Sequence, residues 1–572
     1  MKRFQGIAAS PGIAFGPVFV YRPVQLIVQR PQADNPAAEW ARCQGAVSQA
    51  QKELAKLRKK MASQVGEAEA AIFDAHQMIV CDPDVEDELR SEVESGASAE
   101  AAVEIVFARA VKDFEAMPDP LFRARAADFA DVSRRLLCLL LDVRDDSLAQ
   151  LDSPAIILAQ DLMPSDTAQM DKAMVRGFCT AGGGPLSHTA ILARNLGLPA
   201  VVGLDEEVLR LADGTQMVVD GDAGLVIAEP DEKQLEDYQR RAGEMAAVRA
   251  TAAALAHEPA ITRDGRRIEV VANIGLPGEE VVALQAGAEG IGLLRTEFLF
   301  VERRVAPSEE EQFRAYQPIF EAMGARPVIA RTLDLGGDKP VPFLSMPREA
   351  NPFLGWRAIR ISLEKPELLK TQLRALLRAG SGHNLKIMFP MVATVEEMQR
   401  ARELVDQAGD ELASRGEPFA DPVEIGCMIE VPSAALLANH LAAHVDFFSI
   451  GSNDLTQYTL AADRDNPAVA TLLDALHPAL LRLVDGVIRA AHAARLWVGM
   501  CGEMAGDPAA IPLLLGLGVD EFSMGAAAIP PAKDLIRRLS IEDAQTLAGQ
   551  ALAQPTAHAV RNLVDRWLAE RA

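Results

Sequence analysis

The C-terminal part of the chain contains the pattern that restricts its fold most strongly, a regular alternation of short apolar runs with helical segments. Eight such runs follow Pro259 in the sequence. They are residues 270–274, 290–294, 328–330, 387–389, 427–429, 447–450, 498–500 and 521–523. Eight strand and helix pairs within about 300 residues are typical of a (β/α)8 barrel. The pattern therefore predicts that residues 259–572 form one TIM-type barrel.

The residues before the barrel have a different pattern of apolar residues. They are expected to form further domains, because a chain of 572 residues is too long for a single hydrophobic core. Residues 1–22 and 145–230 contain strand-like runs and a glycine-rich motif, which predicts one α/β domain. Residues 33–144 carry helical stripes and are predicted to be an inserted helical subdomain. Residues 231–258 are charged and rich in alanine, which predicts a linker helix. The expected fold class is therefore multidomain α/β.

The charge of the chain narrows the kinds of partner that suit it. The sequence has 57 Lys and Arg against 81 Asp and Glu, a formal net charge of −24. Such an acidic balance disfavours nucleic acid and anionic membranes as main partners and suits a small basic protein. No run approaches the roughly 20 apolar residues of a membrane span, and the N-terminus lacks the apolar core of a signal peptide. We expect a cytoplasmic protein without membrane insertion.

A glycine-rich segment, GGGPLSHTAILAR, places His188 directly before an apolar helical stretch. Unpaired backbone N–H groups and the helix dipole at such a position can hold a phosphoryl group. Neutral imidazole is also a competent nucleophile near pH 7. Taken alone, glycines and one histidine more often mark a packed turn, and the complete run is what favours a phosphohistidine.

A second set of chemically useful side chains follows the predicted barrel strands, at the rim where the active sites of such barrels lie. These residues are Arg295, Arg331, Glu430, Asn453, Asp454, Arg464 and Cys501. Three guanidinium groups suit a substrate with phosphate and carboxylate groups. Two carboxylates suit Mg²⁺, which usually completes its shell with substrate and water. Surface salt bridges are the alternative, and the origin of these residues from several strands argues against it.

The six cysteines lack CxxC or zinc-like spacing, which argues against a disulfide framework or a structural metal cluster. Most of them are expected to be buried and inert. Cys501 differs because it follows the run 498–500 at the rim, where a thiol can act as a general acid. A lone cysteine is more often part of the core, so the residues alone leave both roles open.

The chain resembles Enzyme I of the bacterial phosphoenolpyruvate:sugar phosphotransferase system over nearly its whole length. The run around His188 is similar to the phosphohistidine motif shared by Enzyme I, phosphoenolpyruvate (PEP) synthase and pyruvate phosphate dikinase. The strings GIGLLRTEFLF, RTLDLGGDKP, NPFLGWRAIR, IEVPSA, FFSIGSNDLTQYTLAADRDN and VGMCGEMAGD resemble the PEP-binding domain of Enzyme I. The N-terminal ASPGIAFG and the order of the domains extend the likeness.

This resemblance implies a role for each candidate residue. His188 would carry the phosphoryl group with Thr167 beside it, and Cys501 would protonate the enolate of pyruvate. Arg295, Arg331, Asn453, Asp454 and Arg464 would bind PEP, and Glu430 and Asp454 would hold Mg²⁺. Lys339 and Arg357 lie in matching strings, but direct contact with substrate is a weaker expectation for them. Pro185 and Leu186 depart from the family, which commonly has Arg and Thr there.

The activity implied is the first step of sugar uptake by the phosphotransferase system. The enzyme would transfer the phosphoryl group of PEP to His188 and then to a histidine of the phosphocarrier protein HPr, releasing pyruvate. Residues 33–144 would dock HPr, residues 231–258 would act as a hinge region, and the barrel would form a homodimer.

Two other functions are weighed against this one. An ATP-coupled PEP synthase-like enzyme would share both sites, but the chain has no P-loop-like run and no room for a nucleotide-binding domain. A non-catalytic, regulatory paralogue that binds PEP is disfavoured by the presence of His188, Cys501 and the charged rim together. The departures at Pro185 and Leu186 keep that alternative open.

Overall fold

The computed structural model describes most of the chain and divides it into two compact units. The described residues are 2–28, 32, 35–64, 67–117, 120–143, 148–149, 151–184, 187–301, 303–337, 341–344, 346, 349–464, 466 and 469–571. The expectations for Pro185, Leu186 and Lys339 fall outside them. The units comprise residues 1–247 and 248–572, and each is described by itself. Among the described residues, no helix has the length and apolar character needed to cross a bilayer.

An eight-stranded sheet forms the α/β part of the first unit. Its strands are β1 (Lys2–Gln5), β2 (Ile7–Ser10), β3 (Ile13–Val20), β4 (Ala155–Ala159), β5 (Val175–Thr180), β6 (Ala200–Val202), β7 (Gln216–Asp220) and β8 (Leu225–Ala228). Their order is β1-β8-β7-β3-β4-β5-β6-β2, with β3 to β6 parallel and the remaining pairs antiparallel. The first strands of the chain therefore pair into the sheet formed after residue 150, as expected from their sequence.

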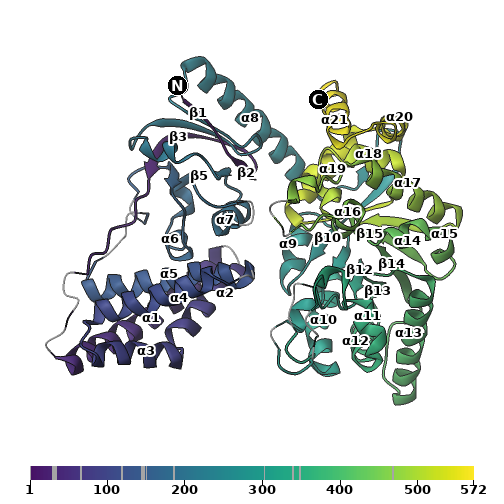
Figure 1. Ribbon diagram of the computed structural model, residues 1–572. Coiled ribbons are helices and arrows are strands. Elements are labelled where there is room, and N and C mark those ends of the chain that lie inside the picture. The colour runs from purple at the N-terminus through teal and green to yellow at the C-terminus, as the bar shows by residue number, and fades with distance from the viewer. Residues whose placement is uncertain are drawn as a thin grey trace. The chain divides into compact units, whose positions relative to one another are not determined.

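Five helices lie between β3 and β4 in the chain. They are α1 (Pro36–Gln64), α2 (Glu67–Val80), α3 (Pro83–Glu94), α4 (Ala99–Glu115) and α5 (Pro120–Leu141). Two shorter helices belong to the α/β part, α6 (Pro164–Thr167) and α7 (His188–Leu196), and they lie on the side of the sheet toward α1–α5 (Figure 1). Leu54 and Phe73 of the helices share one buried core with Leu192 of α7. Apolar burial thus holds the helices against the elements that carry His188.

The long helix α8 (Glu232–Ala254) follows the sheet and occupies most of the segment predicted to be a linker. The division between the two units falls within it, after Ala247.

The second unit is the predicted barrel. Its strands are β10 (Arg267–Ile274), β11 (Ile291–Leu294), β12 (Pro327–Arg331), β13 (Asn384–Phe389), β14 (Glu424–Ile429), β15 (Phe447–Ile450), β16 (Trp497–Met500) and β17 (Glu521–Met524). Each is parallel to its neighbours, and β17 pairs with β10 to close the ring. The short β9 (Ala260–Ile261) adds an antiparallel partner to β10. All eight predicted strands coincide with these, so the prediction of a (β/α)8 barrel is confirmed.

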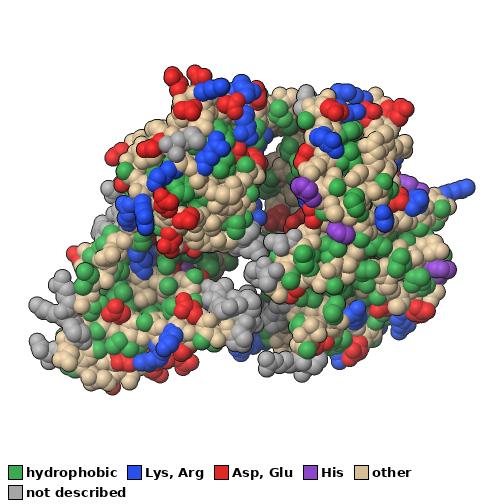
Figure 2. Space-filling model, turned by 45° about the horizontal axis from the view of Figure 1, so that its top comes forward, with side chains coloured by type: hydrophobic (Ala, Val, Ile, Leu, Met, Phe, Trp, Pro, Cys, Tyr) green, Lys and Arg blue, Asp and Glu red, His purple; other side chains and the backbone are tan. Residues whose placement is uncertain are grey.

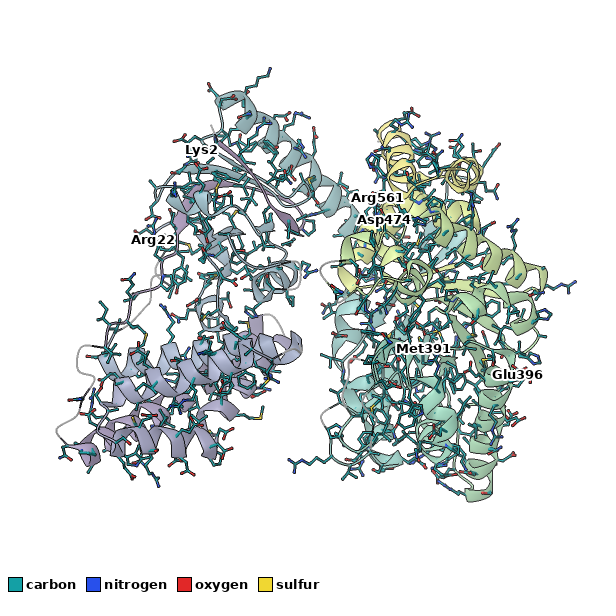
Figure 3. All side chains as sticks on the ribbon, in the orientation of Figure 1. Lys2, Arg22, Met391, Glu396, Asp474 and Arg561 are labelled. Carbon is teal, nitrogen blue, oxygen red and sulfur yellow. The ribbon has the colours of Figure 1, made fainter. Side chains whose placement is uncertain are left out.

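Helices surround the barrel strands (Figure 1). They are α9 (Glu279–Gln285), α10 (Glu309–Met323), α11 (Ile359–Glu364), α12 (Pro366–Ala379), α13 (Val395–Arg415), α14 (Pro432–Leu436), α15 (Ala438–Leu441), α16 (Ser452–Leu460), α17 (Pro478–Ala493), α18 (Ile511–Leu517), α19 (Ile529–Arg538), α20 (Ile541–Leu552) and α21 (Ala557–Ala569). The C-terminal α21 is tied to the unit by Arg561, which donates two hydrogen bonds of 2.7 Å to Asp474 (Figure 3). On the face drawn in Figure 2, acidic and basic side chains are interspersed, as on a solvated surface.

Candidate functional site

His188 is the first residue of α7, a position set by the sequence on either side of it. Ser187 is the N-cap, and its hydroxyl accepts a hydrogen bond from the backbone N–H of Ala190 at 3.4 Å. Gly197 ends the helix in the left-handed conformation, with φ of 67°. A serine before the helix and a glycine after it are the usual caps. The imidazole is therefore placed where the helix dipole and free N–H groups favour an incoming anion.

Thr167 fixes the orientation of the His188 ring. Its hydroxyl oxygen lies 3.1 Å from His188 Nε2 and 2.9 Å from the carbonyl oxygen of Pro164. The hydroxyl has one proton and two neighbours, and in either arrangement the contact holds the imidazole in place. Thr167 is buried at the end of α6, so the structure brings together two residues that are 21 positions apart in sequence.

The surroundings of His188 favour its neutral form. Burial lowers the pKa of the imidazole, and the nearby His76 acts in the same direction. The carboxylates of Asp131, Asp161 and Asp128 oppose this shift, but the pKa remains below its usual value of 6.5. His188 is therefore uncharged at pH 7, as a nucleophile must be.

At the barrel rim, Arg331 ends β12 and lies within a buried network of charges. Its Nη2 donates to Glu297 Oε1 at 2.9 Å, and Nη1 lies 3.4 Å from Asp334 Oδ2. Arg357 binds both oxygens of Asp334 at 2.9 Å. Although burial opposes the charge of Arg331, the carboxylates of Glu297, Asp334 and Glu430 raise its pKa. The buried arginines are thus neutralised within the protein and held in fixed positions.

Arg295 is the exception among the rim arginines. It follows β11, is exposed, and makes no ion pair with the part of the chain that the structure describes. It lines a cavity of about 680 Å³ together with Asn273, Glu279 and Glu503. A guanidinium without an internal partner at a cavity wall is suited to a bound anion.

Asn453, Asp454 and Arg464 lie on α16 and the loop after it. Arg464 Nη1 is 3.4 Å from Asp454 Oδ2, and the Arg464 guanidinium lies 5.7 Å from the ring centre of Phe353. The side-chain oxygen of Asn453 accepts a hydrogen bond from the backbone N–H of Glu503 at 3.0 Å. That bond fixes the orientation of the Asn453 amide, whose nitrogen can then donate to another group.

Glu430 and Asp454 form a buried pair of carboxylates whose chemistry fits a cation. Burial first, and then the charges of Asp454 and Asp334, raise the pKa of Glu430 to about 8. Asp454 Oδ1 is buried without a hydrogen-bond partner among the described residues. A Cβ on Gly451 would lie 2.9 Å from Glu430 Oε2, so glycine is needed for this approach. Two carboxylates from the protein, completed by substrate and water, match the preference of Mg²⁺.

Glu430 is held in place from the neighbouring strand. Its Oε1 accepts a 2.6 Å hydrogen bond from the backbone N–H of Met391, which follows β13 and is labelled in Figure 3. The described residues contain no group of three or more His, Cys, Asp or Glu side chains arranged for a metal ion. The protein itself thus offers the cation two carboxylates rather than a full set of ligands.

Cys501 directly follows β16, at the carboxyl end of the strand. It is 4% exposed and packs with Leu293, Ile329 and Met388. Its thiol donates to the carbonyl oxygen of Ile450 at 3.6 Å. Burial raises the pKa of the thiol to about 12, so the group keeps its proton at neutral pH. A protonated thiol at the rim is able to donate that proton to a bound substrate.

The structure thus gathers all seven rim residues named from the sequence at the carboxyl ends of the strands, and it leaves His188 in the other unit. The sequence did not predict three further residues that bind the rim arginines. Glu297 and Asp334 neutralise Arg331, and Tyr458 accepts a hydrogen bond from Arg357 while donating one to the carbonyl of Phe353. Both carboxylates follow strand ends in RTE and RTLD, which was the available signal.

Three family models match successive parts of the chain. Residues 249–541 match the family model for the PEP-binding domain of PEP-utilising enzymes. Residues 5–125 match the N-terminal region of those enzymes, and residues 151–224 match their mobile domain. The chain therefore belongs to the class of PEP-utilising enzymes.

Curated relatives identify the family within this class. A phosphoenolpyruvate-protein phosphotransferase of Geobacillus stearothermophilus is 44% identical over 99% of this chain and 98% of the relative. Proteins of the same name from Bacillus subtilis (strain 168) and Listeria monocytogenes are 42% and 44% identical, with coverage of 98% and 100% of both chains. The chain belongs to the phosphoenolpyruvate-protein phosphotransferase family, which is the Enzyme I family.

Proposed function

We propose that this enzyme transfers the phosphoryl group of PEP to its own His188 and then to a histidine of HPr, releasing pyruvate as the first step of sugar uptake. The observation that carries the proposal is the presence of two complementary sites in one chain. A neutral histidine at a helix start can accept a phosphoryl group, and a rim of arginines, carboxylates and a protonated thiol can bind PEP.

The rim would bind PEP through its anionic groups. Within the described residues, Arg295 has no ion pair to break, so it can bind a substrate oxygen directly. Arg331 and Arg464 add positive charge from fixed positions, and the Asn453 amide donates one further hydrogen bond. Such an arrangement stabilises the charge that spreads over the phosphoryl oxygens during transfer.

Mg²⁺ would be held by Glu430 and Asp454, and when bound it would neutralise charge on the phosphate and carboxylate of PEP. The raised pKa of Glu430 supports this assignment, because a cation would relieve the repulsion between the two carboxylates. Asp454 Oδ1 also makes no hydrogen bond among the described residues, although Arg357 Nη1 lies 3.6 Å from it.

In the first half-reaction, a lone pair on the His188 imidazole forms the new N–P bond while the bond from phosphorus to the enol oxygen of PEP breaks. The electron pair of that bond remains on the leaving enolate of pyruvate. Cys501 donates its thiol proton to the methylene carbon, which yields pyruvate, and the thiolate regains a proton from water. The two sites lie in different compact units, so the reaction requires the units to meet, with α8 as the connecting hinge.

In the second half-reaction, His188 passes the phosphoryl group to HPr docked on the helices of residues 33–144, and no enolate is involved. The acidic net charge of the chain supports a basic partner. We also propose that the enzyme acts in the cytoplasm as a homodimer formed through the barrel.

The test uses purified full-length protein with labelled PEP, Mg²⁺ and HPr. We expect acid-labile label on His188 and, after HPr is added, on HPr. Consumption of pyruvate that depends on ATP would instead favour a PEP synthase-like enzyme. PEP binding without any labelling would favour a regulatory paralogue.

A further inference from the structure

The turn that carries Thr167 is held in place by two residues of α5. The backbone N–H of Ser165 donates to Asp131 Oδ2 at 3.0 Å. Arg135 Nη2 donates to the Ser165 hydroxyl at 2.8 Å. Ser165 and Asp131 are both buried, at 6% and 2% exposure, so water competes little with the bond between them, whereas the Arg135–Ser165 bond is only partly buried.

Helix α1 supports the same turn from a second side. Lys60 Nζ donates to the carbonyl oxygen of Gln169 at 3.0 Å. Glu53 accepts a hydrogen bond from Arg135 Nη1 at 3.0 Å and so fixes the guanidinium that binds Ser165. The four-residue helix α6 is too short to be stable alone, so these contacts, together with the 2.7 Å hydrogen bond from the Tyr21 hydroxyl to Asp166, help to determine where Thr167 lies.

Behind Asp131 lies a buried histidine of α2 that the phosphoryl transfer does not use. His76 is fully buried, and its Nε2 lies 3.3 Å from Asp128 Oδ1. Its Nδ1 lies 3.8 Å from Asp131 Oδ2, too far for a hydrogen bond. Asp131 thus stands between His76 of the helical part and Ser165 of the turn that contacts His188.

We propose that Asp131 is a positioning residue for phosphoryl transfer at His188, acting through the backbone of Ser165 to hold Thr167 against the imidazole. The proposal rests on the proposed function of His188. No hydrogen bond joins Asp131 to His188 among the described residues, so its effect on geometry passes through α6. The helical part would then do more than dock a partner, because it would also set the geometry of the nucleophile in the α/β part.

Asp131 has a second effect that can be separated from the first. Its negative charge raises the pKa of His188, together with the charges of Asp161 and Asp128 and against the effect of burial and of His76. Asp131→Asn keeps a carbonyl oxygen that can accept from Ser165 but removes the charge. Asp131→Ala removes both the charge and the hydrogen-bond acceptor.

The experiment measures single-turnover labelling of His188 from labelled PEP between pH 5.5 and 8.5, in the full-length protein. For Asp131→Ala we expect a rate about 10- to 100-fold lower at every pH, because the threonine and the ring are misplaced. Asp131→Asn should restore the rate at pH 8 to within about threefold of wild type. Its acidic limb should move to lower pH, because His188 loses a charge that raises its pKa.

Asp74→Asn is the matched control, since Asp74 lies on α2, pairs with Arg58 at 3.0 Å and makes no hydrogen bond to Ser165, Thr167 or His188 among the described residues. It should match wild type in rate and in pH profile. A folded Asp131→Ala protein that labels at the wild-type rate would overturn the proposal. Equal losses in the Ala and Asn variants would also overturn it, because the charge alone would then account for the effect.

Asp131→Leu replaces Asp131→Ala should that variant fail to fold, because leucine fills the space of the aspartate but accepts no hydrogen bond. It is combined with Thr167→Val in a double-mutant cycle. If Asp131 acts by holding Thr167 against the imidazole, the double variant labels no more slowly than the slower single variant. Losses that multiply would contradict the proposal. Absence of labelling in the wild-type protein would instead reject the proposed function itself.

Discussion

The histidine site and the barrel rim differ in the amount of charge that each holds in place. His188 is neutral, its pKa is lowered by burial, and its hydrogen-bonded neighbour is the uncharged Thr167. At the rim, Arg331 and Arg357 are bonded to buried carboxylates in a continuous network. A nucleophile must keep a lone pair free, whereas a site for a trianion must hold cations in position before the substrate arrives. The difference indicates that transfer between His188 and HPr depends on the histidine site alone, whereas transfer from PEP needs both sites.

The largest expected effect separates the two half-reactions completely. Cys501→Ala removes the proton donor of the rim, and we expect PEP turnover to fall about 10²- to 10⁴-fold. Transfer of label from phosphorylated HPr to His188 should stay at the wild-type rate, because it forms no enolate. Cys427→Ala is the control, since Cys427 is also a buried thiol of the barrel but lies within strand β14. Wild-type pyruvate release by the Cys501 variant would show that another group protonates the enolate.

Substitutions of Arg331 and Arg295 should affect different quantities, because the two arginines differ in their ion pairs. Arg331→Ala leaves Glu297 as a buried charge without its arginine and removes one of the two arginines that pair with Asp334, so we expect the barrel to lose about 3–5 kcal/mol of stability. Arg295→Ala breaks no ion pair among the described residues, so the melting temperature should hardly change while PEP binding weakens by about 1.5–3 kcal/mol. Thermal unfolding and PEP titration measure the two quantities separately. A destabilised Arg295 variant with normal PEP binding would reverse their assigned roles.

A smaller effect is expected at the carboxylate pair. Glu430→Gln keeps the shape of the side chain but removes a negative charge, so the Mg²⁺ concentration needed for half-maximal labelling should rise roughly tenfold, equivalent to about 1.4 kcal/mol. Glu424→Gln is the control, because Glu424 lies at the other end of the same strand and pairs with Lys386. A Mg²⁺ titration of the Glu430 variant that superimposes on wild type would exclude Glu430 as a ligand.

The smallest effect is a nearly flat pH profile at the histidine site. Because its pKa lies below 6.5, His188 is already neutral at pH 7, and a rise to pH 8 removes almost no further proton. The rate of phosphoryl transfer from phosphorylated HPr to His188 should therefore change by less than about twofold between pH 7 and 8. It should fall only as the pH drops below 6.5. An acidic limb centred above pH 7 would mean that the carboxylates, and not burial, dominate the environment of His188.

The sequence was sufficient for the barrel and for the residues at its rim, for a physical reason. The strands are short apolar runs separated by helices, and parallel strands bring the residues that follow them to one edge. Arg295 and Cys501 were found in this way. The partners of Arg331 were not found, because pairing between Glu297, Asp334 and the arginine depends on side-chain geometry within the rim.

The surroundings of His188 were harder to predict. The helical pattern of residues 120–141 predicts a buried face, but it gives no sign that Asp131 on that face bonds a turn more than 30 residues away. Contacts of this kind depend on how the helices pack against the sheet, which periodicity alone does not determine. The resemblance placed Thr167 beside the histidine, and the structure adds the residues that hold it there.

The most direct test locates the phosphoryl group after a single turnover. Full-length wild-type and His188→Ala proteins are mixed with labelled PEP and Mg²⁺, quenched at neutral to alkaline pH, digested and mapped by mass spectrometry. We expect one acid-labile phosphate on His188 in the wild-type protein, none in the variant, and equal PEP binding by both because the rim lies in the other unit. Acid-labile phosphate on another residue, or labelling that persists in the His188 variant, would contradict the assignment of His188 as the phosphoryl acceptor.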